Sequence, residues 1–233
     1  MKRCSRICVL FLLPVLLMAS DVETRVLDLL RTHDPDGLFI VESLLQAPKS
    51  FSFGDGSSVT MGGTEGFRMY VRGTSRTDIL DSLNTVVHEM CHGFTSRMAL
   101  VLQAKSGGRR RAADAFYIGG RQVVLVPRRG VFPSRLIKDL IPAALREGRF
   151  STYIHPSTAN LGTQVDGIYG LLDEWNAYYH GTRTSVKIVD AFLAMPGTIE
   201  TWSAALTGFY GTLYACGEFK IYILAALEYA RQE

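Results

Sequence analysis

The stretch that most constrains the fold is residues 79–105, where apolar side chains recur at helical spacing and Asp78 precedes them as a candidate N-cap. Inside it lies the pattern His-Glu-x-x-His, with His88 and His92 four positions apart. Residues four apart on an α-helix lie one turn above each other on the same face. The stretch therefore predicts one long helix that points two imidazoles at the same place.

Two imidazoles one turn apart are suited to binding one metal ion. Zn²⁺ takes histidine nitrogens as ligands, and a catalytic zinc site has three protein ligands and one open position. Glu89 projects at the edge of the histidine face, where it would contact a water molecule rather than the metal. The sequence predicts a Zn²⁺ site with His88 and His92 as ligands and Glu89 as the general base. The alternative is an ordinary helix carrying two unrelated histidines.

The third ligand has to come from a distant part of the chain. The metzincin signature would place a histidine six positions after His92, but Met98 stands there. We expect Glu174 to be the third ligand, because one face of its predicted helix carries small side chains that allow close helix approach. These small residues are Gly170, Ala177 and Gly181. Asp173 is the second choice, and His155 and His180 are further alternatives.

Taken together, His88, Glu89, His92 and Glu174 give the chain a resemblance to the gluzincin zinc metallopeptidases. In that group, two histidines of His-Glu-x-x-His are joined by a glutamate from a later helix. The resemblance implies an α+β, mainly helical, zincin-like fold. It would have a small strand region before the metal-binding helix and a helical C-terminal lobe. It covers little more than these two helices, and Tyr178 stands where the group often has an acidic residue.

Peptide hydrolysis also needs a hydrogen-bond donor aimed at the developing oxyanion. We expect Tyr178, Tyr179 or His180 in this role, because they follow Glu174 closely. Other donors that the sequence offers are Tyr153, His155 and Arg183.

The first twenty residues have the layout of a secretory signal peptide. Lys2, Arg3 and Arg6 precede an apolar run over residues 7–17, and Ala19 and Ser20 follow it. The run is too short to span a bilayer as a helix. We therefore expect residues 1–20 to be removed and the protein to be secreted or periplasmic. The alternative, an uncleaved signal segment, would be the only contact with a membrane.

Charge and cysteine content follow from that cleavage. Of 25 Lys and Arg residues three lie in the leader, which leaves 22 basic against 22 acidic residues. A neutral chain gives no basis for nucleic-acid binding, which requires a basic surface. Cys91 and Cys216 remain after the leader, and they form either one disulfide or two free thiols.

The rest of the chain reads as a single zincin-like metallopeptidase domain over residues 21–233. Helices are predicted over residues 22–32 and 38–46, 134–147, from Asp166 onward, and over 199–231 with a break near Gly217. Hairpins are predicted within 51–73 and 116–126. The sequence thus predicts a secreted or periplasmic zinc peptidase acting on a peptide or protein substrate. The alternatives are a catalytically inactive zinc-binding envelope protein of zincin-like fold and a protein without metal.

Overall fold

The computed structural model describes residues 22–62 and 66–233, so the predicted signal peptide over residues 1–20 lies outside the described residues. The fold is α+β and mainly helical, with two small antiparallel sheets. A helix over residues 22–33 is followed by α2 (Pro35–Leu45), β1 (Ser50–Ser52), β2 (Ser58–Thr60), η1 (Arg68–Tyr70), α3 (Arg76–Lys105), β3 (Ala113–Gly119), β4 (Gln122–Pro127), η2 (Ser134–Leu140), η3 (Ala143–Leu145), α4 (Phe150–Tyr153), α5 (Gly162–Val165), α6 (Ile168–Lys187), α7 (Val189–Leu193) and α8 (Ile199–Gln232).

Helix α3 is the central element and carries the His-Glu-x-x-His pattern. It begins three residues earlier than predicted, because Ser75 is the N-cap and Asp78 is the third helical residue. The Ser75 hydroxyl accepts a hydrogen bond from the Asp78 amide, and the Asp78 carboxylate accepts one from the Ser75 amide, both at 3.1 Å. This capping box satisfies two amides that the first turn leaves without helical partners. The long predicted helix is confirmed.

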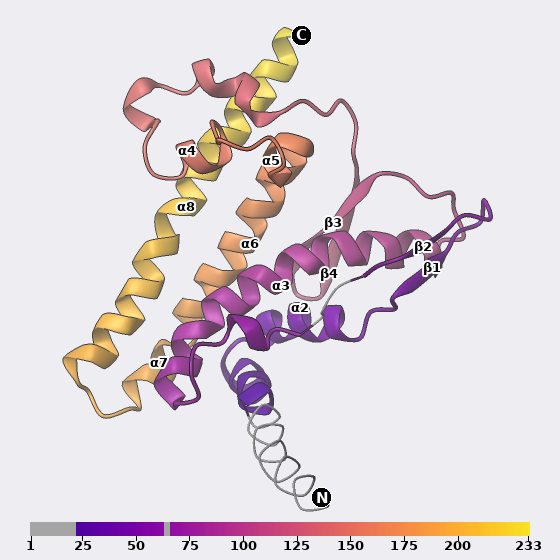
Figure 1. Ribbon diagram of the computed structural model, residues 1–233. Helices are drawn as coiled ribbons and strands as arrows, with labels where there is room; N and C mark the ends of the chain where they lie inside the picture. Colours follow the sequence, from indigo (N-terminus) through magenta and orange to yellow (C-terminus); the bar gives the residue numbers. More distant parts are fainter. Residues whose placement is uncertain (1–21, 63–65) are drawn as a thin grey trace, which may run out of the picture.

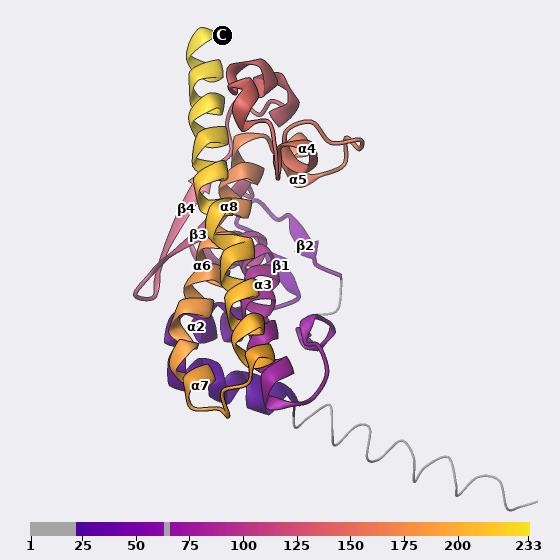
Figure 2. The same cartoon turned by 90° about the vertical axis from the view of Figure 1, so that its left-hand side faces the viewer.

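Three long helices form the body of the molecule, with α6 packed between α3 and α8 (Figures 1 and 2). Helix α8 runs without a break through Gly217, so the predicted interruption there is wrong. A glycine costs a helix only about 1 kcal/mol. The neighbouring Phe219 and Tyr222 are fully buried in the core between α6 and α8 and stabilise the helix across that position.

The N-terminal helices belong to the folded core. Val26, Leu30 and Ile40 are completely buried in the cluster that also contains the inner face of α3. Helix α2 begins at Pro35, three residues before the predicted start at residue 38, and Asp34 directly precedes it. The buried Asp34 carboxylate does not cap the helix, because Arg183 and Thr184 of α6 each donate a hydrogen bond to it at 2.7 Å. Residues 22–45 are therefore joined to the body by both apolar packing and a buried ion pair.

The two hairpins flank α3 in sequence. β1 and β2 pair around the Gly54-Asp55-Gly56 turn before α3, and β3 and β4 pair around Gly119-Gly120 after it. The strand region before α3 is confirmed, but the larger hairpin follows α3, which the zincin-like expectation did not include. The helix predicted over 134–147 is wrong: two 3₁₀ turns are found instead, separated at Pro142. Proline has no amide proton and blocks a continuous helix.

Among residues 22–62 and 66–233, no helix combines the length and hydrophobicity that a bilayer crossing requires. The two cysteines that remain after the leader are both free thiols. Cys91 is buried and Cys216 is half-buried. The sequence left open one disulfide or two free thiols, and the structure has two free thiols.

Candidate metal centre

The site forms where α6 crosses close to α3. A Cβ added at Gly181 would lie 2.8 Å from Asn84 Oδ1 and 3.2 Å from the Cβ of His88, so only glycine permits this approach. Ala177, one turn earlier, is completely buried at the same contact. Gly170 serves a different neighbour, because its added Cβ would meet the Gly162 carbonyl of α5 at 2.5 Å. Two of the three small residues predicted to bring α6 to α3 thus do so.

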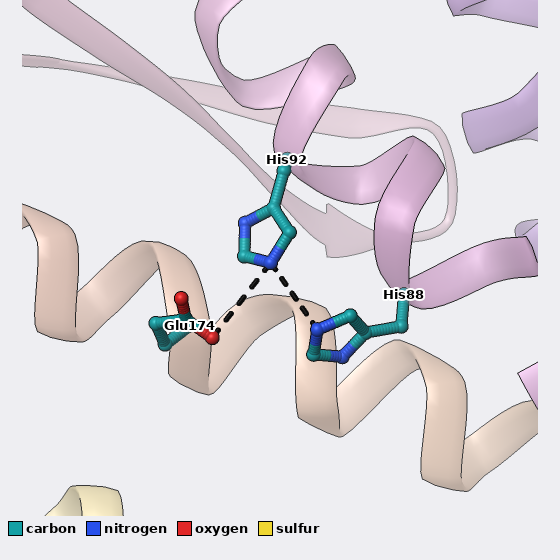
Figure 3. A group of neighbouring side chains, drawn as sticks. All are labelled: His88, His92 and Glu174. Atoms are coloured by element: carbon teal, nitrogen blue, oxygen red, sulfur yellow. Dashed lines mark hydrogen bonds and ion pairs between the residues drawn. The ribbon is translucent and has the colours of Figure 1, made fainter. Parts of the chain in front are cut away.

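The close crossing brings His88, His92 and Glu174 together (Figure 3). One ligand atom from each residue lies within 4.8 Å of the others. The Nε2 atoms of His88 and His92 are 3.2 Å apart, and His92 Nε2 lies 3.7 Å from Glu174 Oε2. All three atoms point to the same place, as Figure 3 shows. Among the described residues this is the only group of three or more such side chains with metal-binding spacing.

Each histidine has an outer hydrogen-bond partner that fixes its ring. His92 Nδ1 lies 2.7 Å from Asp173 Oδ2. His88 hydrogen-bonds the backbone of Ala177. A histidine that donates its outer N–H in this way leaves the inner nitrogen free as a metal ligand, an arrangement common around protein-bound metals. Asp173 therefore lies behind His92, as a partner of the histidine, and Glu174 lies on the side of the inner nitrogen.

Comparison with protein-family models, curated proteins and solved structures gives no match. What the site does has to be judged from its own geometry and electrostatics.

Burial and neighbouring charges move the pKa values of the three central groups in different directions. Burial and the charges of His92 and Arg149 lower the pKa of His88 to about 3. Burial lowers the pKa of His92, but the hydrogen bond and charge of Asp173, with the charges of Glu174 and Glu89, outweigh it and raise the pKa to about 9. Burial raises the pKa of Glu174 to about 7. When no metal is bound, a proton shared by the two rings is therefore carried by His92, because its pKa is the higher of the two.

The residues present fit a zinc ion. Glu174 Oε2 is buried and has no hydrogen-bond partner among the described residues. A buried carboxylate oxygen without a partner is costly. A cation at the meeting point of the three atoms would satisfy all of them. Two imidazole nitrogens and one carboxylate oxygen form a ligand set that zinc uses in catalytic sites.

Glu89 lies beside this group without belonging to it. It follows His88 on α3 and is half-buried, so it is neither sealed in the core nor fully in solvent. Its negative charge contributes to the raised pKa of both His92 and Glu174. Glu89 therefore affects the electrostatics of the group but is not one of its three members.

Tyr178 is the only one of the three predicted oxyanion donors that contacts the group. Its ring meets the His88 ring edge-on at 4.4 Å between centroids. Its hydroxyl lies 3.3 Å from the Tyr153 hydroxyl, and Tyr153 also hydrogen-bonds Glu174. The Arg149 guanidinium carbon lies over the Tyr178 ring, 4.8 Å from its centroid. Two hydroxyls and one cation therefore stand beside the ligands.

The structure does not bring Tyr179 and His180 to the ligands. Tyr179 is 49% exposed, and His180 is 2% exposed with Nε2 3.0 Å from the Tyr117 carbonyl of β3. The reason is helical rotation: Tyr178 is one turn after Glu174, and each further residue turns by about 100° away from that face. The other suggested ligand, His155, is exposed after α4, and Arg183 is bound to Asp34.

A small cavity of about 150 Å³ opens beside His92 and Glu174. Its far wall is a charged group that the sequence did not indicate: Arg128 of β4 is paired with both oxygens of Asp114, at 2.6 and 2.7 Å, and with Asp166. Asp173 lines the same cavity and contacts His92. Arg128 and Arg149 were missed because only long-range contacts bring them to the site, and no local sequence pattern marks such contacts.

Cys91 lies on the same helix as the two histidines but outside the metal centre. It is completely buried, and Asn176 Nδ2 donates a hydrogen bond to its sulfur at 3.4 Å. Burial raises the pKa of the thiol well above its ordinary value. An uncharged buried thiol is a poor zinc ligand, because the thiolate is the form that binds. This environment agrees with a site made of histidine and carboxylate ligands only.

Proposed function

We propose that the protein is a zinc-dependent peptidase with His88, His92 and Glu174 as metal ligands. The observation that carries the proposal is the convergence of two imidazole nitrogens on a buried carboxylate oxygen that lacks any hydrogen-bond partner among the described residues. Zinc bound there would supply Lewis acidity and lower the pKa of a water molecule toward neutrality.

The side chains around the ligands supply the remaining steps. Glu89 accepts the proton of the attacking water and delivers it to the leaving amine. The hydroxyls of Tyr178 and Tyr153 stabilise the negative charge that develops on the carbonyl oxygen of the substrate. Asp173 holds the His92 ring in the orientation that presents Nε2. The expected signal peptide would bring this activity to the periplasm or the exterior of the cell, with peptides or proteins as substrates.

A second function is a zinc-binding envelope protein without activity. The cavity beside His92 has a volume of about 150 Å³, whereas ligand pockets commonly measure about 300–1,000 Å³. A narrow cavity favours this alternative, because a peptide needs room on both sides of the metal. The two functions share the metal site and differ only in turnover.

Zinc content and turnover measured on the same preparations separate these functions. The double variant His88→Ala/His92→Ala should lose its zinc, since two of three ligands are removed. Glu89→Gln should keep one zinc per chain and lose about 10²–10⁴-fold in hydrolysis of a quenched-fluorescent peptide library, the usual contribution of a general base. Glu147→Gln, an exposed glutamate elsewhere, is the matched control and should behave as wild type.

Each possible outcome supports or excludes one of the two functions. A wild-type protein with bound zinc and no hydrolysis of any peptide would favour the inactive zinc-binding protein. Zinc bound equally well by the double histidine variant would remove the basis of both functions. Full activity in Glu89→Gln would show that another group takes the proton.

A further inference from the structure

Helix α8 has a second apolar face that points away from the molecule. Leu206, Tyr210, Leu213, Leu224 and Leu227 are between 41% and 65% exposed. Figure 2 shows α8 in front of the rest of the molecule, with no described segment over this face. The inner half, which includes Phe219, packs against α6.

The exposed apolar residues follow the spacing of a helix-pairing seam. From Leu206 they recur at alternating steps of four and three residues to Leu227, with Gly217 and Lys220 occupying the two remaining places. A repeat that averages 3.5 residues keeps one stripe facing a partner helix along its length. A helix face that contacts only water normally carries polar side chains at such positions.

The stripe is nearly symmetric about its middle. Tyr210 lies seven residues before Gly217, and Leu224 lies seven residues after it. If a second copy of α8 packs antiparallel with Gly217 at the crossing, Tyr210 of each chain meets Leu224 of the other. Lys220 then faces Tyr214 of the other chain, which is 70% exposed and offers a cation–π contact. Such self-complementarity is what a two-fold symmetric interface requires.

Gly217 suits the crossing point. A Cβ added there would have no neighbour within 4 Å in its own chain, so packing inside the chain does not require glycine. A glycine at a crossing lets two helices approach closely.

The exposed area is adequate for a stable dimer. With Tyr214, the five apolar residues expose on the order of 700 Å² per chain, against about 800 Å² per partner in standard interfaces.

We infer that this outer face of α8, defined by Leu206, Tyr210, Leu213, Leu224 and Leu227, is a homodimer interface in which two copies of α8 pack antiparallel about Gly217. The metal centre lies on the opposite side of α6, between α3 and α6, so the dimer leaves the ligands accessible. The inference does not depend on zinc or on peptidase activity.

Sedimentation velocity on the purified protein tests the dimer. We expect a dimer at micromolar concentration, and we expect Leu224→Glu to raise the dissociation constant by at least about 100-fold, because the interface would then bury a carboxylate without a partner against Tyr210 of the other chain. Leu125→Glu is the matched control: Leu125 lies on β4 and is 37% exposed. It should dimerise as wild type. Circular dichroism on both variants verifies folding.

Cysteine crosslinking tests the antiparallel arrangement. In a Cys216→Ser background, Gly217→Cys should form a disulfide-linked dimer on mild oxidation, because the two α-carbons face each other within the about 7 Å that a disulfide spans. Ser203→Cys should not, since antiparallel pairing places its two copies about 40 Å apart.

Several outcomes would overturn the interface. These are a monomeric wild-type protein, a dimer unaffected by Leu224→Glu, or crosslinking through Ser203→Cys rather than Gly217→Cys. A monomer that binds lipid vesicles through the same face would assign this surface to a membrane instead.

Discussion

Replacing Asp173 with asparagine tests the most specific feature of the metal centre. The Asp173 carboxylate lies 2.7 Å from His92 Nδ1 and holds the inner nitrogen of the ring toward Glu174. Asparagine has nearly the same shape but no charge, and its amide can rotate to present a donor instead of an acceptor. We expect Asp173→Asn to fold normally and to bind zinc more weakly.

The expected size follows from the contact. Loss of an outer partner of a metal-bound histidine typically lowers metal affinity by about 10–100-fold, which corresponds to about 1.4–2.7 kcal/mol. Loss of a direct ligand should cost more, so Glu174→Ala should bind zinc more weakly than Asp173→Asn. This order separates the ligand from the residue behind it, although the two are neighbours in the sequence.

Zinc affinity is best measured by competition with a chromophoric chelator at fixed pH. Asp166→Asn is the matched control, because Asp166 lines the same cavity but pairs with Arg128 and not with a histidine. If Asp166→Asn weakens zinc binding as much as Asp173→Asn does, the loss comes from the removed negative charge. The contact between Asp173 and His92 would then not be responsible. If Asp173→Asn binds zinc as tightly as wild type, the role assigned to Asp173 is wrong.

Two further predictions concern the supports of the site. Gly181→Ala should lower the free energy of unfolding by about 1–3 kcal/mol through overpacking and weaken zinc binding, whereas Gly211→Ala, with open space around it, should be neutral or slightly stabilising in urea titrations. Burial lowers the pKa of His180 below its ordinary 6.5. The unfolded chain therefore binds a proton that the folded chain does not, and stability should fall as pH drops below about 6.5. The pKa of His88 is lowered in the same direction, so His180→Gln should reduce this dependence without abolishing it; an unchanged pH profile would show that His180 does not contribute.

Local sequence determined the helix that carries the histidines and the place of the larger hairpin. The spacing of His88 and His92 fixes their common face, because four residues make about one helical turn. Gly119 and Gly120 mark the hairpin because both adopt positive φ, which glycine tolerates without strain. These features depend only on neighbours within a few residues, so the chain itself is enough to predict them.

The tertiary structure decided which acidic residue joins the inner nitrogens of His88 and His92 and which lies behind His92. Asp173 and Glu174 both reach His92, and their roles differ only because α6 presents them at a rotation that the crossing with α3 fixes at Gly181. It likewise turned Tyr178 toward His88 and buried His180 against β3. A helix can be predicted from its sequence, but its rotation against a neighbour depends on how distant surfaces fit together.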